Sequence, residues 1–562
     1  MGEAGPVSGN LFELLIRFDP AGLHDAAAKW RDLSTGAQSA ENRHRSQVNG
    51  PLRQAKWEGA DAQKAFYTLN RTEQILEILR VESAAFALTL DTVAERMYQA
   101  QTNLKNAVHR AEEQGLVVGA DGTVNLPSLG EGERNDPDAV SSTERRALTT
   151  LRGDVQERIN KALADAQQAS DQGDRALGRL DAGILTNPRV FGSAAETAAD
   201  ARGVAADLGL VDPYVPENKD PQKVADWWKS LTPDQQSTYL ALYPDRIGQL
   251  DGLPAAARDE ANRLVLDQQL DELKAGNARG SGMTAEEYNA REQTLMKLKD
   301  QLDVHDTAVE DKRVFLLGLD AKAYGGDGKV IVAVGNPDTA DHTAVLVPGT
   351  GTTIDSTGGQ LARASDLQEA AKQASKGTNQ KVSVISWLGY DAPEVPVQQA
   401  PNLSVAWDAR AQDGAEALRQ FTQGTRVAQG DHPSHLSVFG HSYGTTLVGA
   451  AAAGGAGLGA DEIVAVASPG LTVDRADQLH IDPNHFWTGR AADDNISMAA
   501  GYTLGADPVD DEFGGQRFEV DTSGHSGYWD DGSKSLDNQG RIIVGKEPTT
   551  LPRLTFNPPG PL

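Results

Sequence analysis

Residues 436–454 read "LSVFGHSYGTTLVGAAAAG", and this stretch decides the fold of the C-terminal half. The apolar run 436–439 enters "GHSYG" (440–444), and small residues follow. The pattern predicts a buried strand, a tight corner and a helix. Glycine on either side of Ser442 suits such a corner, because backbone and helix crowd there. We expect Ser442 to be a nucleophile held at a strained corner, and an ordinary structural turn is the alternative.

Apolar runs surround this corner along the C-terminal half. Two of them, 313–320 and 329–335, predict a hairpin. The others are 342–349, 381–389, 462–468, 485–489 and 517–520. Helical stretches such as 408–428 and 445–453 lie between most of them. Apolar strands that alternate with helices predict a mainly parallel sheet covered on both faces. The sequence therefore predicts an α/β domain over residues 306–562.

The preceding 305 residues read almost entirely as helix. Good helix formers dominate 23–48 and 60–109, which predicts a long helical hairpin within residues 1–127. "VVGADGTVNLP" (117–127) predicts a small β-hairpin that turns at Asp121-Gly122. The breaker-rich "GEGERNDPDA" (130–139) predicts a linker, and a helical linker or cap region then fills residues 128–305.

Composition narrows the classes of partner. The 80 acidic and 52 basic side chains give a formal net charge of −28, which repels phosphates and argues against nucleic-acid binding. The absence of cysteine excludes disulfides, thiol nucleophiles and cysteine-ligated zinc. No apolar run approaches the roughly 20 residues of a transmembrane helix, and we expect no Sec-type signal peptide at the start. The expected location is the cytoplasm, or outside the cell by a non-Sec route.

A nucleophilic serine needs a base, and in this arrangement the chain order is serine, acid, histidine. Only His480, His485 and His525 follow Ser442. His480 falls in a loop and His485 begins a strand, so packing or surface roles are expected for both. His525 lies just past the last strand, where a loop can carry it back over Ser442. His525 is the predicted base.

Three aspartates are candidates for the carboxylate that orients the base. Asp494, in "RAADDNIS" after the strand 485–489, is the preferred one. Asp493 is the close second. Asp507 is the third, with an Asx-Pro turn as its alternative role.

The oxyanion formed during acyl transfer needs two backbone N–H donors. One belongs to the residue after the nucleophile, which is Tyr443. The other is expected from "VLVPGTGTT" (345–353), where Thr350 or Gly351 is favoured because Pro348 has no N–H. An ordinary glycine-rich turn is the alternative. The sequence implies no cofactor and no metal. The segment "GGAGLGA" (454–460) looks like a dinucleotide-binding loop, but it ends a helix instead of opening one.

These motifs in combination resemble a family of actinobacterial α/β hydrolases. The resemblance rests on "HTAVLVPGTGTT", "KVSVISWLGYDAP", "SVFGHSYGTT" and "GHSGYWD" and covers roughly residues 227–545. It implies an α/β-hydrolase fold and a serine triad of Ser442, His525 and Asp494. The expected activity is hydrolysis of a small-molecule or lipid-like carboxylic ester through an acyl-enzyme.

The N-terminal hairpin resembles the WXG-type proteins of type VII secretion. It carries "WEG" (57–59) between two long helical segments. We expect Gly59 to make the turn and Trp57 to pack across the helix pair. The resemblance implies a helical protein partner and export by a type VII-like route. The family's Tyr-x-x-x-Asp/Glu signal is absent just after the hairpin. The alternative to an enzyme is a secretion-associated scaffold with an idle hydrolase fold.

Water must be excluded from a site of this kind. The segment 470–484 is too short for a helical lid. Residues 389–409 or the helices before 305 are therefore expected to cover the site. We expect part of 220–305 to pack against the hydrolase domain near its active-site rim. Trp227 and Trp228 could supply the docking surface or pack among the helices. Removal of residues 1–120 is expected to leave turnover nearly unchanged.

Overall fold

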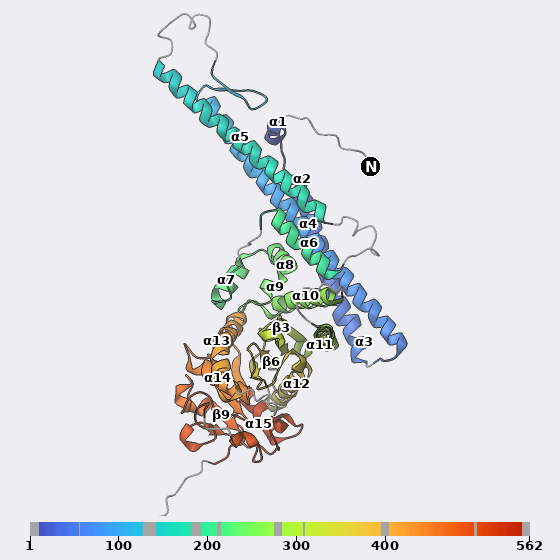
Figure 1. Ribbon diagram of the computed structural model, residues 1–562, viewed down its shortest axis with the longest axis vertical. Helices are drawn as coiled ribbons and strands as arrows, with labels where there is room; N and C mark the ends of the chain where they lie inside the picture. The colour runs from blue at the N-terminus through green and yellow to red at the C-terminus, as the bar shows by residue number, and fades with distance from the viewer. Residues whose placement is uncertain are drawn as a thin grey trace, which may run out of the picture. The chain divides into compact units, whose positions relative to one another are not determined.

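The computed structural model describes most of the chain and divides it into two compact units (Figure 1). The described residues are 11–55, 57–127, 142–180, 193–210, 215–274, 284–306, 310–394, 404–498 and 503–552. The first unit combines Met1–Ser39 with Ile75–Pro213, and the second combines Ala40–Gln74 with Tyr214–Leu562. The predicted linker at 130–139 lies outside the described residues.

These units differ from the three consecutive ranges expected from the sequence. The division falls inside two long helices, α2 (Ala21–His44) and α4 (Ala60–Glu113). Residues 40–74, at the tip of the expected hairpin, group with the C-terminal half. Residues 40–74 group with the C-terminal half because they make buried contacts with it, and local sequence patterns do not reveal such contacts.

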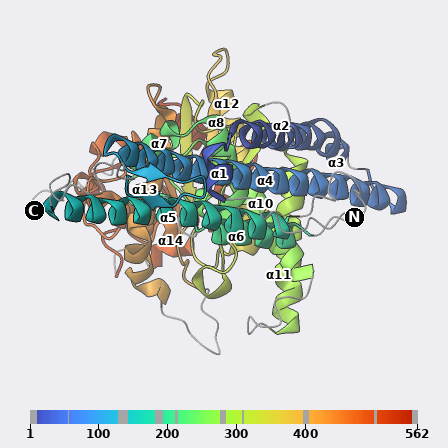
Figure 2. The same ribbon diagram turned by 90° about the horizontal axis from the view of Figure 1, so that it is seen from above.

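The first unit is helical. Its other elements are α1 (Leu11–Ile16), α5 (Ser142–Arg179), α6 (Ala194–Asp207), β1 (Val117–Val118) and β2 (Val124–Asn125). Helices α4 and α5 run side by side (Figures 1 and 2), and Leu104 and Ile159 belong to the core of this unit. Trp30 of α2 stacks on Phe86 of α4 with ring centroids 4.3 Å apart. The strands β1 and β2 pair antiparallel, which confirms the predicted small hairpin.

The hairpin tip turns at Gly59. After α2 the chain makes a π-helical turn, Arg45–Asn49, and the short helix α3 (Gly50–Gln54). Gly59 has φ +103°, a conformation that favours glycine, as expected. Trp57 contacts the Phe66 ring at 6.1 Å between centroids but remains 43% exposed. It therefore packs on one neighbouring aromatic ring and does not fill a core between the helices.

The second unit contains an eight-stranded sheet in the order β10-β9-β8-β7-β5-β6-β4-β3. Its strands are β3 (Val314–Asp320), β4 (Lys329–Val334), β5 (His342–Val347), β6 (Val382–Leu388), β7 (His435–His441), β8 (Glu462–Val466), β9 (Phe486–Gly489) and β10 (Gln516–Arg517). The pairs β3–β4 and β4–β6 are antiparallel and the others are parallel, so the predicted mainly parallel sheet is confirmed. The expected strand at 517–520 is shorter, because β10 ends at Arg517. Phe518 still donates to the carbonyl of Thr488 in β9 and forms an isolated bridge with Thr550.

Helices pack against this sheet in pairs. Helix α12 (Thr357–Ala374) packs with α15 (Lys534–Ile543), and α13 (Ala409–Gln429) packs with α14 (Tyr443–Ala453). Strands β5 and β7 are buried along almost their whole length. Such continuous apolar strands are typical of parallel sheets covered by helices, and they bring the carboxyl ends of β5 and β7 side by side.

Four helices before the sheet belong to the same unit. They are α7 (Pro221–Ser230), α8 (Pro233–Leu242), α10 (Ala255–Lys274) and α11 (Ala285–Val304), with the single turn α9 (Pro244–Ile247) between α8 and α10. Leu266 of α10 and Leu298 of α11 lie in the hydrophobic core that also contains the sheet. This confirms that part of 220–305 packs on the sheet domain. Trp228 instead joins a smaller core among the helices.

Helix α11 also reaches the loops at the carboxyl ends of the strands. Arg291 donates to the carbonyl of Gly326, in the β3–β4 connection, at 2.6 Å. Thr294 hydrogen-bonds Asp355, in the segment that follows β5. The segment after β5 also contains Thr350, so α11 braces one side of the loop expected to hold the oxyanion donor.

A buried charge cluster joins residues 40–74 to α10 and α11. Arg45 lies 3.7 Å from Asp306 and is paired with Glu41. Lys299 of α11 lies 3.9 Å from Glu73 and 2.9 Å from Asp267. Ion pairs buried in this way leave an uncompensated charge when one partner is removed. Removal of residues 1–120 therefore takes Glu41, Arg45 and Glu73 out of this cluster, and we expect the deletion to lower the stability of the second unit. That turnover is nearly unchanged by the deletion stays a prediction.

Candidate active site

Ser442 occupies a strained corner between β7 and α14. Its φ of 55° and ψ of −130° lie outside the regions that residues other than glycine favour. Such a conformation costs on the order of 1–3 kcal/mol and persists only where the surroundings enforce it. A Cβ at Gly440 would lie 2.5 Å from Cα of Thr445, and one at Gly444 would lie 2.3 Å from the carbonyl oxygen of Val347. The glycines are required by close backbone approach, as the sequence predicts.

Three of the predicted site residues meet at this corner. Nε2 of His525 lies 2.9 Å from Oγ of Ser442. Nδ1 of the same ring lies 2.9 Å from Oδ1 and 3.0 Å from Oδ2 of Asp494. The Asp494 side chain is fully buried, whereas the His525 side chain is 39% exposed. Serine, imidazole and carboxylate thus form a continuous hydrogen-bonded row in which His525 is the most exposed member and Ser442 and Asp494 are buried.

Asp494 is held by contacts that the other two aspartates lack. Its Oδ1 accepts from the backbone N–H of Ile496 at 2.9 Å, and its Oδ2 accepts from the Tyr528 hydroxyl at 2.6 Å. Asp493 instead accepts from the N–H of Gly524 at 2.8 Å, so it orders the loop that carries His525.

The third candidate and the two rejected histidines have other partners. Asp507 forms an ion pair with Arg490 at 2.7 Å and accepts from Val509 N–H. His485 hydrogen-bonds Glu462 at 2.9 Å, and that contact raises its pKa. His480 lies against Gly457, in the loop after α14. The structure does not bring these residues to Ser442.

The expected oxyanion donors lie in two segments beside Ser442. Tyr443 is the first residue of α14, so its N–H has no acceptor within the helix. The positive end of the helix dipole lies at the same place. In the loop after β5, the N–H of Gly351 donates to the carbonyl of Pro393 at 2.8 Å. That contact occupies the N–H of Gly351, and Thr350 is the other of the two predicted candidates.

Two further residues shape the site without a strong signal in the sequence. A Cβ at Gly349 would lie 2.7 Å from Cβ of Ser442, so this glycine lets the β5 loop approach the nucleophile. Tyr528 connects the acid to the backbone, because its hydroxyl also accepts from Ala491 N–H at 3.0 Å. Both fall in quoted motifs, "VPGTG" and "GHSGYWD", but their roles depend on contacts between distant segments.

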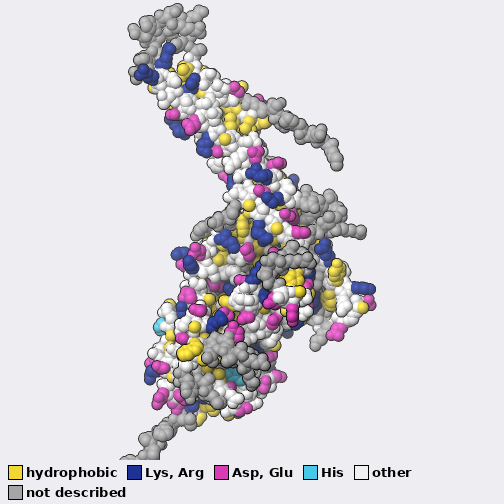
Figure 3. All heavy atoms as spheres, viewed as in Figure 1, with side chains coloured by type: hydrophobic (Ala, Val, Ile, Leu, Met, Phe, Trp, Pro, Cys, Tyr) yellow, Lys and Arg dark blue, Asp and Glu magenta, His cyan; other side chains and the backbone are white. Residues whose placement is uncertain are grey.

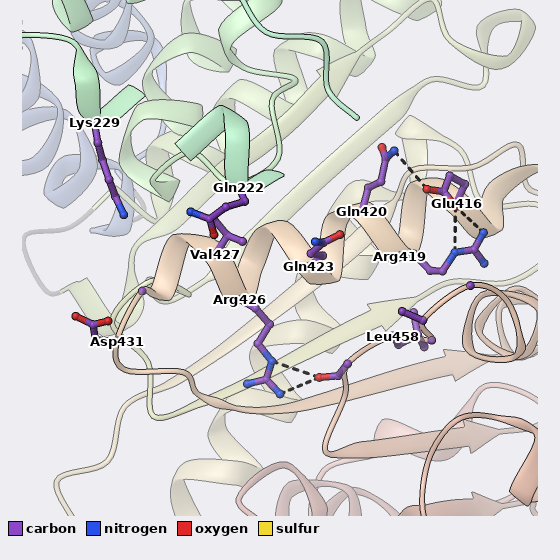
Figure 4. Close-up of a pocket in the computed structure, with 15 residues that line it drawn as sticks. Gln222, Lys229, Glu416, Arg419, Gln420, Gln423, Arg426, Val427, Asp431 and Leu458 are labelled. Atoms are coloured by element: carbon purple, nitrogen blue, oxygen red, sulfur yellow. Dashed lines mark hydrogen bonds and ion pairs between the residues drawn. The ribbon is translucent and has the colours of Figure 1, made fainter. Parts of the chain in front are cut away.

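A cavity among the described residues lies elsewhere. It has a volume of about 690 Å³ and is lined by α13, by Gln222 and Lys229 of α7, and by the loop 455–459 (Figure 4). Arg426 points across it and donates to the carbonyl of Gly459, while Arg419 pairs with Glu416. Both arginines are thus engaged with other groups of the protein.

The described residues offer little else that suggests a site. They contain no group of histidine and carboxylate side chains placed to hold a metal ion, and none of their helices is both long and apolar enough to span a membrane. On the visible face, basic and acidic side chains are interspersed and no large patch of one sign stands out (Figure 3).

Comparison with known families agrees with this geometry. Residues 325–503 match the family described as "Alpha/beta hydrolase". The C-terminal part is an α/β-hydrolase domain. The matched segment includes Ser442 and Asp494 and ends before His525, so the family match does not cover the histidine. The predicted fold, a helical N-terminal region followed by a hydrolase domain, is confirmed.

The chain is also similar to mycobacterial proteins. An uncharacterized protein of Mycobacterium tuberculosis is 28% identical over 564 residues, which cover 88% of this chain and 81% of the relative. An uncharacterized protein of Mycobacterium bovis is 28% identical over 206 residues, covering 36% of this chain and 74% of the relative. The first similarity extends far beyond the hydrolase domain, so a related protein shares the helical region as well.

Proposed function

We propose that the protein is a serine hydrolase that cleaves a carboxylic ester through an acyl-enzyme on Ser442. The observation that carries the proposal is the position of His525, whose two ring nitrogens lie 2.9 Å from Ser442 Oγ and 2.9 Å from Asp494 Oδ1. A base in contact with both a hydroxyl and a buried carboxylate is the arrangement that activates a serine. No other described histidine has these contacts.

In the first half of the reaction, Nε2 of His525 takes the proton from Ser442 as Oγ attacks the ester carbonyl. Asp494 holds the Nδ1–H tautomer and stabilises the imidazolium that forms. His525 then gives the proton to the departing alcohol, which leaves the acyl group on Ser442. In the second half, a water molecule gives a proton to His525 as its oxygen attacks the acyl carbon. The bond between that carbon and Oγ then breaks, His525 returns the proton to Ser442, and the carboxylic acid leaves.

The oxyanion of each tetrahedral intermediate lies next to the N-terminus of α14 in this proposal. The Tyr443 N–H is one donor and Thr350 N–H is the second. Preorganised donors of this kind contribute about 3–4 kcal/mol each to the stability of the transition state. The substrate is a small-molecule or lipid-like ester, and the N-terminal hairpin is a candidate surface for a helical protein partner.

A fluorophosphonate probe tests the chemistry without knowledge of the substrate, because it labels serines that have an active base. We expect the full-length protein to be labelled and Ser442→Ala to be unlabelled. Ser523→Ala is the matched control, since this exposed serine lies two residues from His525. It should be labelled like the native protein. A folded native protein that is not labelled would contradict the proposal and favour a scaffold with an idle hydrolase fold.

A further inference from the structure

His441 precedes the nucleophile and makes a second contact with the residue that supplies the base. It is the last residue of β7 and pairs in register with Val466 of β8, so its backbone is fixed by the sheet. Its Nε2 lies 2.9 Å from the backbone carbonyl oxygen of His525. Two consecutive residues, 441 and 442, therefore hold residue 525, one through its backbone and the other through its ring.

The proton of His441 has a defined place. A carbonyl oxygen can only accept, so Nε2 of His441 must carry the hydrogen. Burial lowers the pKa of His441 to about 3, which keeps the ring neutral at physiological pH. The charged or titratable groups that act on it are His525, Arg363 of α12 and Asp494. A neutral imidazole has one N–H, and it is used in this bond.

The ring of His441 is also fixed by aromatic contacts. Its centroid lies 4.9 Å from the Trp529 ring in an edge-on arrangement and 5.1 Å from the His525 ring. His441 is only 6% exposed, so it has little freedom to move. By contrast, the loop that carries His525 is partly exposed and has no strand pairing of its own at that residue. Without a contact from the sheet, the base would depend on its own ring contacts for its position.

We propose that His441 is a positioning residue that fixes the backbone of His525 so that its imidazole stays within hydrogen-bond distance of Ser442. The inference rests on the proposed hydrolysis. Loss of the bond lets the His525 loop shift, and a displacement of about 1 Å in a reacting group can cost on the order of 100-fold in rate. His441 itself takes no part in proton transfer.

The test uses His441→Phe, which keeps a ring but removes the donor, and His441→Gln, whose side-chain amide can restore it. Full-length proteins are compared by kcat and KM for p-nitrophenyl butyrate and by the rate of labelling with a fluorophosphonate. We expect His441→Phe to lower kcat and the labelling rate by about 10- to 100-fold with little change in KM. His441→Gln should recover most of the loss. His432→Phe, at an exposed histidine before β7, is the control and should be unchanged.

The outcomes separate this inference from the proposed function. Absence of Ser442-dependent labelling in the native protein would overturn the hydrolase proposal and this inference with it. Native labelling with an unchanged kcat in a folded His441→Phe protein would overturn the positioning role alone. If His441→Phe does not fold, His441→Gln decides: a folded glutamine variant with native kcat supports the hydrogen bond as the requirement. A 100-fold loss of kcat in a folded glutamine variant contradicts it.

Discussion

Tyr528 donates a hydrogen bond of 2.6 Å to Oδ2 of Asp494 and accepts one of 3.0 Å from the backbone N–H of Ala491. Tyr528 is fully buried, and burial together with the bond to Asp494 raises its pKa. The hydroxyl therefore stays protonated and keeps donating to the carboxylate. This bond and the N–H of Ile496 leave the Asp494 carboxylate facing His525.

Tyr528→Phe removes one of the hydrogen bonds that orient Asp494. We expect kcat to fall about tenfold and the free energy of unfolding to fall by about 1–3 kcal/mol, because Ala491 N–H is left buried without an acceptor. Steady-state kinetics and chemical denaturation measure the two effects. An unchanged kcat in the variant would show that Asp494 is oriented without the tyrosine.

Replacement of the three aspartates should separate the orienting acid from its neighbours. Asp494→Asn should lower kcat by roughly 10⁴-fold, because the asparagine favours the wrong tautomer of His525. Asp493→Asn should be mild, since Asp493 contacts only the loop backbone at Gly524. Asp507→Asn should mainly lower stability through the lost pair with Arg490. A large loss of kcat in either of the last two proteins, with Asp494→Asn active, would contradict the assignment.

Glu73 should make the second unit sensitive to acid. Burial raises its pKa, but the hydrogen bond with His44 and the charge of Lys299 outweigh burial and lower the pKa to about 2. The unfolded value is 4.5, so the native state favours the ionised form. This stability is present above pH 4.5 and is lost as the pH falls toward 2, on the order of 3 kcal/mol. Between pH 4.5 and 2, the melting temperature of Glu73→Gln should therefore fall less than that of the native protein.

Asp303, in the same cluster, should have the opposite effect on how stability depends on pH. Burial raises its pKa from 3.8 to about 6 against the charge of Lys299. The native state therefore binds a proton more tightly than the unfolded state, and this stability is present below pH 3.8 and lost as the pH rises through 6. Asp303→Asn should flatten the change in melting temperature between pH 4 and 6. An unchanged pH profile would mean that Asp303 is ionised throughout.

Arg45 should stabilise the packing of residues 40–74 against the rest of the second unit. Arg45→Met leaves Glu41 and Asp306 buried without this cation, and we expect a loss of about 3–5 kcal/mol in the free energy of unfolding. Arg43→Met is the matched control, because Arg43 is an exposed arginine two positions earlier on the same helical run. It should change stability by less than about 0.5 kcal/mol. Equal stability of the two variants would show that the cluster contributes little.

The local sequence was enough to predict the strand, corner and helix around Ser442. The steric demands at that corner involve residues a few positions apart, as the approach of Gly440 to Thr445 shows. Continuous apolar runs likewise predicted the parallel strands, because both sides of such strands are buried. The order of residues along the chain also left His525 as the histidine best placed to reach Ser442.

Other features depend on contacts between distant segments. Asp493 and Asp494 are chemically identical neighbours, and only the packing of Tyr528 and His525 distinguishes the environments of their carboxylates. Gly351 offers a backbone N–H like any other residue, but the partner that occupies it, Pro393, lies 42 positions away. No local pattern encodes such a pairing.

The sequence by itself determined the fold class and the strained corner at Ser442, because periodicity and glycine sterics act over a few residues. It also reduced the candidates for the base and the acid that act with Ser442 to a few residues. Only the tertiary structure decided which carboxylate contacts His525 and that His441 lies within hydrogen-bond distance of the His525 backbone. It also decided that residues 40–74 group with the hydrolase domain. Each of these features depends on contacts between residues that are far apart in the sequence. His44 and Glu73, which hydrogen-bond, are 29 positions apart, and Glu41 and Asp306, which both pair with Arg45, are 265 positions apart. Burial then fixes their charges and hydrogen bonds, since an unpaired polar group in the interior is costly.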